Sequence, residues 1–132
     1  MGRKSRDKGA AWEREVARLL THATGTECRR QLRQYQVGGS DIDTKLPIAV
    51  ECKTGYRISI ASALEQADRN AEFGEVPFVW VKQNRKGKSP MRYIAINEQH
   101  FLPMLIEFLR LWVTDAVSAN AIFKEISEDE LN

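Results

Sequence analysis

A carboxylate and an ammonium group share one face of an apolar segment near the middle of the chain. Side chains alternate between the two faces of a β-strand, so Glu51 and Lys53 point the same way in a strand over residues 48–54. Val50 and Cys52 then lie on the opposite, apolar face. Burying charge is costly unless the charge is paired or bound to a metal. The placement therefore indicates either a reactive site or an exposed ion pair on an edge strand.

Asp41 lies ten residues upstream of Glu51, before a turn at Leu46-Pro47. Two short strands joined by that turn would bring the two carboxylates together, with Lys53 beside them. Carboxylate oxygens are ligands for a hard divalent cation, and an ammonium group suits a phosphodiester substrate. Asp43 shares the face of Asp41, so it is either a surface acid or an alternative ligand.

The spacing of Asp41, Glu51 and Lys53 resembles the motif of the PD-(D/E)XK nuclease superfamily, an Asp followed after a spacer by Glu-x-Lys. Ser40 stands where the family usually has Pro. Residues 41–53 also resemble phage nucleases that contain Asp-Ile-x-x-x-Leu-Pro-x-x-x-Glu-Cys-Lys.

This resemblance implies a DNA endonuclease that uses Mg²⁺, for which Mn²⁺ can substitute. The metal ligands would be Asp41, Glu51 and the backbone carbonyl of Cys52. Lys53 would hold or deprotonate the attacking water and offset the charge that develops on phosphorus.

A third acidic residue comes from an amphipathic helix expected over residues 8–22. Its apolar stripe contains Trp12, Val16, Leu19 and Leu20. Glu13 falls inside this arc and Glu15 outside it, so Glu13 is either a further site residue or an acid at the edge of the stripe. Residues 8–15 resemble the opening helix of archaeal-type Holliday-junction resolvases, Lys-Gly-x-x-x-Glu-Arg-Glu. That resemblance implies that Glu13 is a further metal ligand, directly or through water.

Gln66 resembles a glutamine that several members of the superfamily place near the site. A helical wheel places Gln66 outside the apolar arc of its helix, which favours a surface position. The arc consists of Ile60, Leu64, Ala67 and Ala71.

The composition is that of one soluble globular domain, with 132 residues, 42% hydrophobic and 29% charged. No segment has the length of a membrane span or the pattern of a signal peptide. The cysteines Cys28 and Cys52 are predicted to be reduced. We therefore expect a cytoplasmic protein without membrane contact. The resemblance to phage nucleases and archaeal-type resolvases implies a phage or prokaryotic host cell.

The charge is unevenly distributed. Residues 1–35 contain nine Lys and Arg against four Asp and Glu, whereas residues 98–132 contain two against seven. A basic surface beside an acidic metal site suits a nucleic-acid backbone, although charged runs are also common on solvated faces. The candidate DNA-binding residues are Lys8, Arg29, Arg30, Arg33 and Tyr35.

The periodicity predicts an α/β fold with the element order αβββαββα. Strands are expected over residues 27–36, 40–44, 48–54, 77–82 and 91–96, with a turn over 83–89, a second helix over 59–73 and a last helix over 99–113. The resemblance implies a restriction-endonuclease-like αβββαβ core, a mixed central sheet flanked by helices, with an extra C-terminal strand and helix. The single domain would comprise a flexible basic arm (1–7), the core (8–96) and a C-terminal extension (97–132).

The last helix is apolar nearly all round, which predicts burial in a homodimer. Alternatively, residues 114–132 fold back and cover it. A symmetric dimer would suit paired cuts in a four-way junction. The predicted function is a resolvase-like endonuclease acting on branched DNA. The alternatives are a nicking, single-strand or repair nuclease of the same fold, or a non-catalytic nucleic-acid-binding module.

Overall fold

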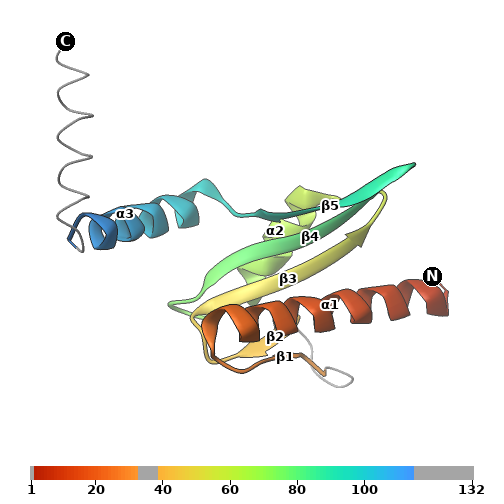
Figure 1. Cartoon of the computed structure of the whole chain (residues 1–132), viewed down its shortest axis with the longest axis horizontal. Helices are drawn as coiled ribbons and strands as arrows, with labels where there is room; N and C mark the ends of the chain where they lie inside the picture. Colours follow the sequence, from red (N-terminus) through yellow and green to blue (C-terminus); the bar gives the residue numbers. More distant parts are fainter. Residues whose placement is uncertain (1, 33–38, 115–132) are drawn as a thin grey trace, which may run out of the picture. The chain divides into compact units, whose positions relative to one another are not determined.

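The computed structural model describes residues 2–32 and 39–114. The chain divides into a first unit that ends at Asn97 and a second unit that begins at Glu98. The elements follow the predicted order (Figure 1). They are α1 (Arg3–Thr24), β1 (Cys28–Arg30), β2 (Ile42–Thr44), β3 (Ile48–Gly55), α2 (Ile60–Asn70), β4 (Val76–Arg85), β5 (Lys88–Ala95) and α3 (Glu98–Thr114).

The first unit is an α/β structure built on a mixed sheet with the strand order β3-β4-β5. Strands β3 and β4 are parallel, and β4 and β5 are antiparallel. The parallel pair requires a crossover, which α2 provides, whereas a tight turn joins the antiparallel pair. Strands β1 and β2 form a separate two-stranded antiparallel sheet, so they do not extend the central sheet by regular pairing.

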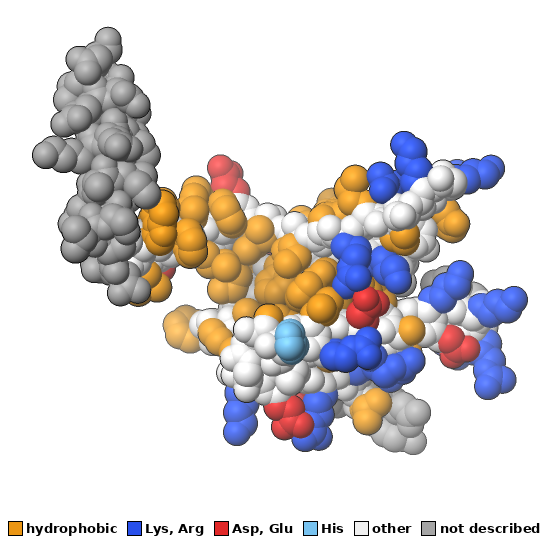
Figure 2. All heavy atoms as spheres, in the orientation of Figure 1, with side chains coloured by type: hydrophobic (Ala, Val, Ile, Leu, Met, Phe, Trp, Pro, Cys, Tyr) orange, Lys and Arg blue, Asp and Glu red, His pale blue; other side chains and the backbone are white. Residues whose placement is uncertain are grey.

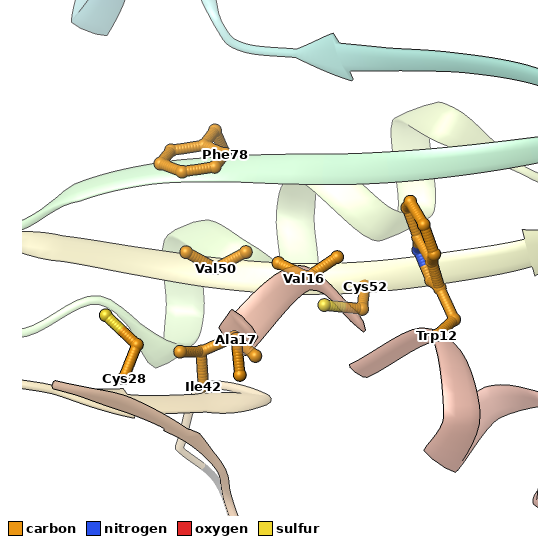
Figure 3. Packing of buried hydrophobic residues seen from close by; sticks show 8 residues of the cluster. All are labelled: Trp12, Val16, Ala17, Cys28, Ile42, Val50, Cys52 and Phe78. Carbon is orange, nitrogen blue, oxygen red and sulfur yellow. The ribbon is translucent and has the colours of Figure 1, made fainter. Parts of the chain in front are cut away.

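Helices α1 and α2 cover opposite faces of the central sheet (Figure 1). On one face, α1 packs on β3 and β4 around a cluster drawn in Figure 3. Its members are Trp12, Val16, Ala17, Cys28, Ile42, Val50, Cys52 and Phe78. On the other face, Ala63 and Ala67 of α2 pack against Val79 and Val81 of β4. The register pairs Glu51 with Val79 and Lys53 with Val81, which places both charged residues on the α2 face.

Helix α1 begins at Arg3, five residues earlier than predicted, so the expected flexible arm forms its first turns. Arg and Lys are good helix formers, and Gly9 is tolerated within the helix. The apolar stripe is also narrower than predicted, because Leu19 is 38% exposed.

Other boundaries differ from the prediction as well. Strand β1 spans only residues 28–30, and part of the longer predicted strand lies outside the described residues. Helix α2 ends at Asn70, because Ala71 is already extended, well before the Gly74 that was expected to end it. The hairpin turn shrinks to residues 86–87, because backbone pairing extends β4 and β5 through polar residues.

The second unit contains α3, whose apolar side chains include many exposed ones. They are Phe101, Leu102, Met104, Ile106, Phe108, Leu109, Leu111 and Trp112. The homodimer and its fold-back alternative both stay predictions, since residues 115–132 lie outside the described part. No helix in the described part of the chain is long and apolar enough to cross a membrane.

The α1 interface can be tested by comparing two side chains of the same helix. We expect Val16→Ala to lower the free energy of unfolding by about 2 kcal/mol, because Val16 is fully buried and its truncation leaves a cavity. The control Leu19→Ala removes a larger but partly exposed side chain and should cost less. Urea unfolding measures both, and an equal or larger loss for Leu19→Ala would contradict the packing of α1 described here.

Candidate active site

The first predicted site residue, Asp41, is attached to the edge of β3 by two hydrogen bonds. Its Oδ2 accepts a hydrogen bond from the backbone N–H of Cys52 at 2.8 Å. Its own backbone N–H donates to the carbonyl of Val50 at 3.0 Å. Asp41 is only 8% exposed. The structure thus brings Asp41 beside the 51–53 segment, as the turn at Leu46-Pro47 predicts.

The backbone of Cys52 faces the same edge. In an extended strand, the N–H and C=O of one residue point to the same side, and the next residue points to the other side. Because the Cys52 N–H reaches Asp41, the Cys52 carbonyl is also directed away from β4 and toward the edge where Asp41 lies. A carboxylate and a backbone carbonyl, both oxygen donors, therefore face one edge of β3.

Glu51 and Lys53 lie on the α2 face of the same strand. Glu51 is 1% exposed, and both of its carboxylate oxygens are shielded from solvent. Lys53 Nζ donates a hydrogen bond to Gln66 Oε1 of α2 at 3.2 Å. The surface position favoured for Gln66 by the helical wheel is therefore wrong. Gln66 is three residues from Ala63 and adjacent to Ala67, both buried, so it lies at the margin of the face that packs on the sheet.

A cavity of about 230 Å³ opens beside the Lys53–Gln66 contact. Lys53 and Gln66 line it together with Arg57 and the hydroxyl-bearing residues Ser59 and Ser62. Two cationic side chains thus border an opening next to the buried Glu51. This arrangement is suited to an anionic group such as a phosphate.

The pKa of the Cys52 thiol is affected by burial and by the charged residues around it. Burial raises the pKa of the Cys52 thiol well above its usual range, and the charges of Asp41, Glu13 and Glu51 raise this pKa further. The Lys53 ammonium acts in the opposite direction on the same pKa. A thiol held neutral in this way is a poor nucleophile. The chemistry of the site therefore belongs to its oxygen and nitrogen groups.

Glu13 is engaged by a basic residue. Its Oε2 accepts a hydrogen bond from Arg30 Nε at 2.7 Å, in a partly buried ion pair that joins α1 to β1. A predicted site acid and a predicted DNA-binding residue are therefore partners. Glu15 is not simply solvated as predicted, because its carboxylate pairs with Arg92 of β5 at 2.9 Å.

The remaining predicted site residues are not brought to β3. Asp43 is exposed and lies opposite Arg29 in the β1–β2 ladder, so the alternative of Asp43 as the ligand is not supported by its position. Arg29 is exposed and pairs with Glu27 at 2.7 Å. Lys8 is an exposed residue of α1. Arg33 and Tyr35 lie outside the described residues.

The donor set fits Mg²⁺ better than a metal that needs a protein cage. Within residues 2–32 and 39–114, no group of three or more His, Cys, Asp and Glu side chains is placed to hold a metal ion. Mg²⁺ is ordinarily bound by one or two carboxylates together with waters and substrate phosphates. The ligands that the resemblance implies, Asp41, Glu51 and the Cys52 carbonyl, are all oxygen donors of the kind that Mg²⁺ accepts.

Comparisons with protein-family models, with curated proteins and with solved structures found no match to this chain.

One cluster was not predicted from the sequence. Lys82, the last residue of the strand predicted over residues 77–82, lies in β4 with its Nζ 5.7 Å from the centroid of the Trp12 ring. Arg92 of β5 lies over the same ring, with Cζ 5.0 Å from the centroid. No local pattern signals this cluster, because its members come from distant parts of the chain.

A site that buries a carboxylate for reaction should be less stable than its neutral variant. We expect Glu51→Gln to raise the free energy of unfolding by roughly 1–3 kcal/mol in a metal chelator, because it removes a buried charge next to Asp41. The matched control is Glu65→Gln, an exposed position on α2, which should leave stability nearly unchanged. Urea unfolding by circular dichroism is the measurement. A clear loss of stability in Glu51→Gln would instead identify Glu51 as a structural ion-pair partner.

Proposed function

We propose that this protein is a Mg²⁺-dependent endonuclease that hydrolyses phosphodiester bonds in DNA, with a restriction-endonuclease-like core and a resolvase-like preference for branched DNA. The observation that carries the proposal is the 2.8 Å hydrogen bond from the Cys52 N–H to Asp41, next to a buried Glu51. This bond supports the proposal because it holds the Asp41 carboxylate beside the strand that carries Glu51 and Lys53.

In the proposed mechanism, Asp41, Glu51 and the Cys52 carbonyl would hold the metal ion. When bound, Mg²⁺ or Mn²⁺ would polarise the scissile phosphate and lower the pKa of a coordinated water. Lys53 holds the attacking water and offsets the negative charge that develops on the phosphate oxygens. Gln66 orients Lys53 through their 3.2 Å hydrogen bond.

A binding module without catalysis is less well supported. Nonspecific binding to DNA needs exposed cations, and it gives no reason to bury a carboxylate that repels phosphate. The chain instead keeps Glu51 at 1% exposure between two structural layers. Such an unfavourable position is typical of a group retained for reactivity.

Cleavage assays test the proposal directly. We expect the protein to cut labelled DNA with Mg²⁺ or Mn²⁺ and to be inactive in EDTA. Glu51→Gln and Lys53→Met should each lower the cleavage rate by about a hundredfold or more, since each removes a charge that acts on the transition state. Asp41→Asn should be as damaging, and Asp43→Asn much milder because Asp43 is exposed and away from β3.

The panel of substrates should include a four-way junction, a flap, a duplex and a single strand of matched sequence. Preferential cleavage of the junction supports the resolvase-like assignment, and preference for another substrate favours one of the related nuclease activities. Wild-type rates in Glu51→Gln or Lys53→Met would exclude the proposed site.

The role of α1 is tested by a pair of isosteric variants. Glu13→Gln should slow cleavage far more than Glu15→Gln, because Glu13 lies within electrostatic reach of Cys52 whereas Glu15 pairs with Arg92. Each variant removes one ion pair of α1, Glu13–Arg30 or Glu15–Arg92. The Glu15→Gln variant therefore controls for the loss of stability that comes from removing such an ion pair. Similar rates for the two variants, measured on the preferred substrate, would remove Glu13 from the site.

A further inference from the structure

A second, larger cavity lies between α1 and the C-terminal ends of β3 and β4. Its volume is about 360 Å³. Its lining includes Lys8 and Trp12 of α1, Thr54 of β3, Lys82 and Asn84 of β4, and Tyr56 of the loop that follows β3. None of these residues belongs to the metal-binding set proposed above.

Two cationic side chains pack over an aromatic ring, Trp12, that lines this cavity. Trp12 is 2% exposed, and its indole Nε1 donates a hydrogen bond to the Trp80 carbonyl at 3.1 Å, which fixes the ring. The ammonium of Lys82 and the guanidinium of Arg92 both lie over that ring, in cation–π geometry. Figure 2 shows Lys and Arg side chains gathered over the N-terminal half of α1 and over the β4–β5 hairpin.

One carboxylate in the lining offsets part of this charge. Glu15 lines the cavity and pairs at 2.9 Å with Arg92, which is not part of the lining, whereas the lining itself contains two cations, Lys8 and Lys82. The cavity therefore has an excess of positive charge. A partner with distributed negative charge, such as a phosphate backbone, complements it.

An exposed aromatic residue stands at the cavity. Tyr56 is 66% exposed, and its backbone is held because Gln83 Nε2 donates hydrogen bonds to the carbonyls of Gly55 and Tyr56. An exposed aromatic ring beside cations is an arrangement by which proteins bind single-stranded nucleic acids. The cations contact phosphates, and the ring stacks on a base.

One residue of the cavity lining lies on β3, the strand that carries the proposed catalytic residues. Thr54 follows Lys53 directly, and it lines both this cavity and the smaller one at the Lys53–Gln66 contact. The two cavities therefore share a lining residue at the C-terminal end of β3, one on the α1 side of the sheet and the other on the α2 side. A strand with one phosphate at Lys53 can continue past Thr54 toward Tyr56 and Lys82.

We propose that this cavity binds one unpaired nucleotide of the DNA strand that is cut, with its phosphate on Lys82 and Lys8 and its base on Tyr56. The inference rests on the proposed function and specifies its substrate class: DNA that is single-stranded next to the cleavage site. In a duplex, the base faces are covered by neighbouring base pairs and cannot stack on Tyr56. A cavity near the lower limit of small-ligand pockets also suits one nucleotide rather than a duplex.

The test is DNA binding in EDTA, where binding is measured apart from cleavage. Fluorescence anisotropy with a labelled oligothymidine is compared with a labelled duplex of equal length. We expect the wild type to bind the single strand more tightly and Tyr56→Ala to weaken that binding about tenfold, the effect of losing one stacked base. Tyr56→Phe should bind like the wild type, which separates stacking from a loss of fold.

A second variant tests the phosphate contact. Lys82→Gln should weaken single-strand binding and lower the slope of log affinity against log salt by about 0.7, the value for one phosphate contact on a single strand. Lys45→Gln removes an exposed lysine outside this cavity and should leave affinity and slope near the wild-type values. Circular dichroism melting confirms that each variant is folded.

The outcomes separate the two proposals. Wild-type binding by both Tyr56→Ala and Lys82→Gln overturns the nucleotide site, even where the protein cleaves DNA. Equal losses on duplex and single strand overturn the assignment of an unpaired nucleotide. Selective loss of single-strand binding, in a protein that cuts no substrate with Mg²⁺ or Mn²⁺, upholds the nucleotide site and rejects the proposed endonuclease.

Discussion

The hydrogen bond from the Cys52 N–H to the Asp41 carboxylate determines much of the first unit. The edge of a sheet has backbone N–H and C=O groups that need partners, and a neighbouring strand usually supplies them. Here Asp41 supplies them, with its carboxylate accepting from Cys52 and its N–H donating to Val50. A side chain takes the place of a strand, which is consistent with the separation of the β1–β2 sheet from the central one. The same bond holds a carboxylate next to Glu51.

The two faces of β3 serve different purposes because two different helices cover them. On the α1 face, Val50 and Cys52 belong to the apolar core. On the α2 face, the small residues Ala63 and Ala67 let the helix approach the sheet closely, and this contact excludes water around Glu51. Low dielectric strengthens every charge interaction there, including the one proposed between Lys53 and a phosphate. Removing Glu51's charge should therefore affect stability and reactivity in opposite directions.

The sequence predicts what depends on local patterns. Alternation identifies β3, and the turn at Leu46-Pro47 places Asp41 beside it, so the order of elements and the position of Asp41 next to residues 51–53 were predictable. The hydrogen bond from the Cys52 N–H to the Asp41 carboxylate was not predicted. Contacts between distant segments were not predictable. The residues of the Glu13–Arg30 and Glu15–Arg92 ion pairs are 17 and 77 positions apart in the sequence. A helical wheel compares Glu13 and Glu15 only by their apolar neighbours on the same helix, so it does not reveal these partners. The wheel failed for Gln66 for the same reason, since a polar partner on β3 determines its position.

The proposed catalytic and nucleotide sites lie close together because of the parallel pairing of β3 and β4. In α/β sheets, ligands bind at the carboxyl ends of parallel strands, where the side chains of neighbouring strands end side by side. Lys53 and Thr54 on β3 are paired with Val81 and Lys82 on β4, so the residue after the proposed catalytic lysine lies beside a cation of the second cavity. Lys53 points to the α2 face and Thr54 to the α1 face, because the strand alternates. A bound strand that contacts both must therefore pass around the end of the sheet, and an unpaired strand can bend there more easily than a duplex.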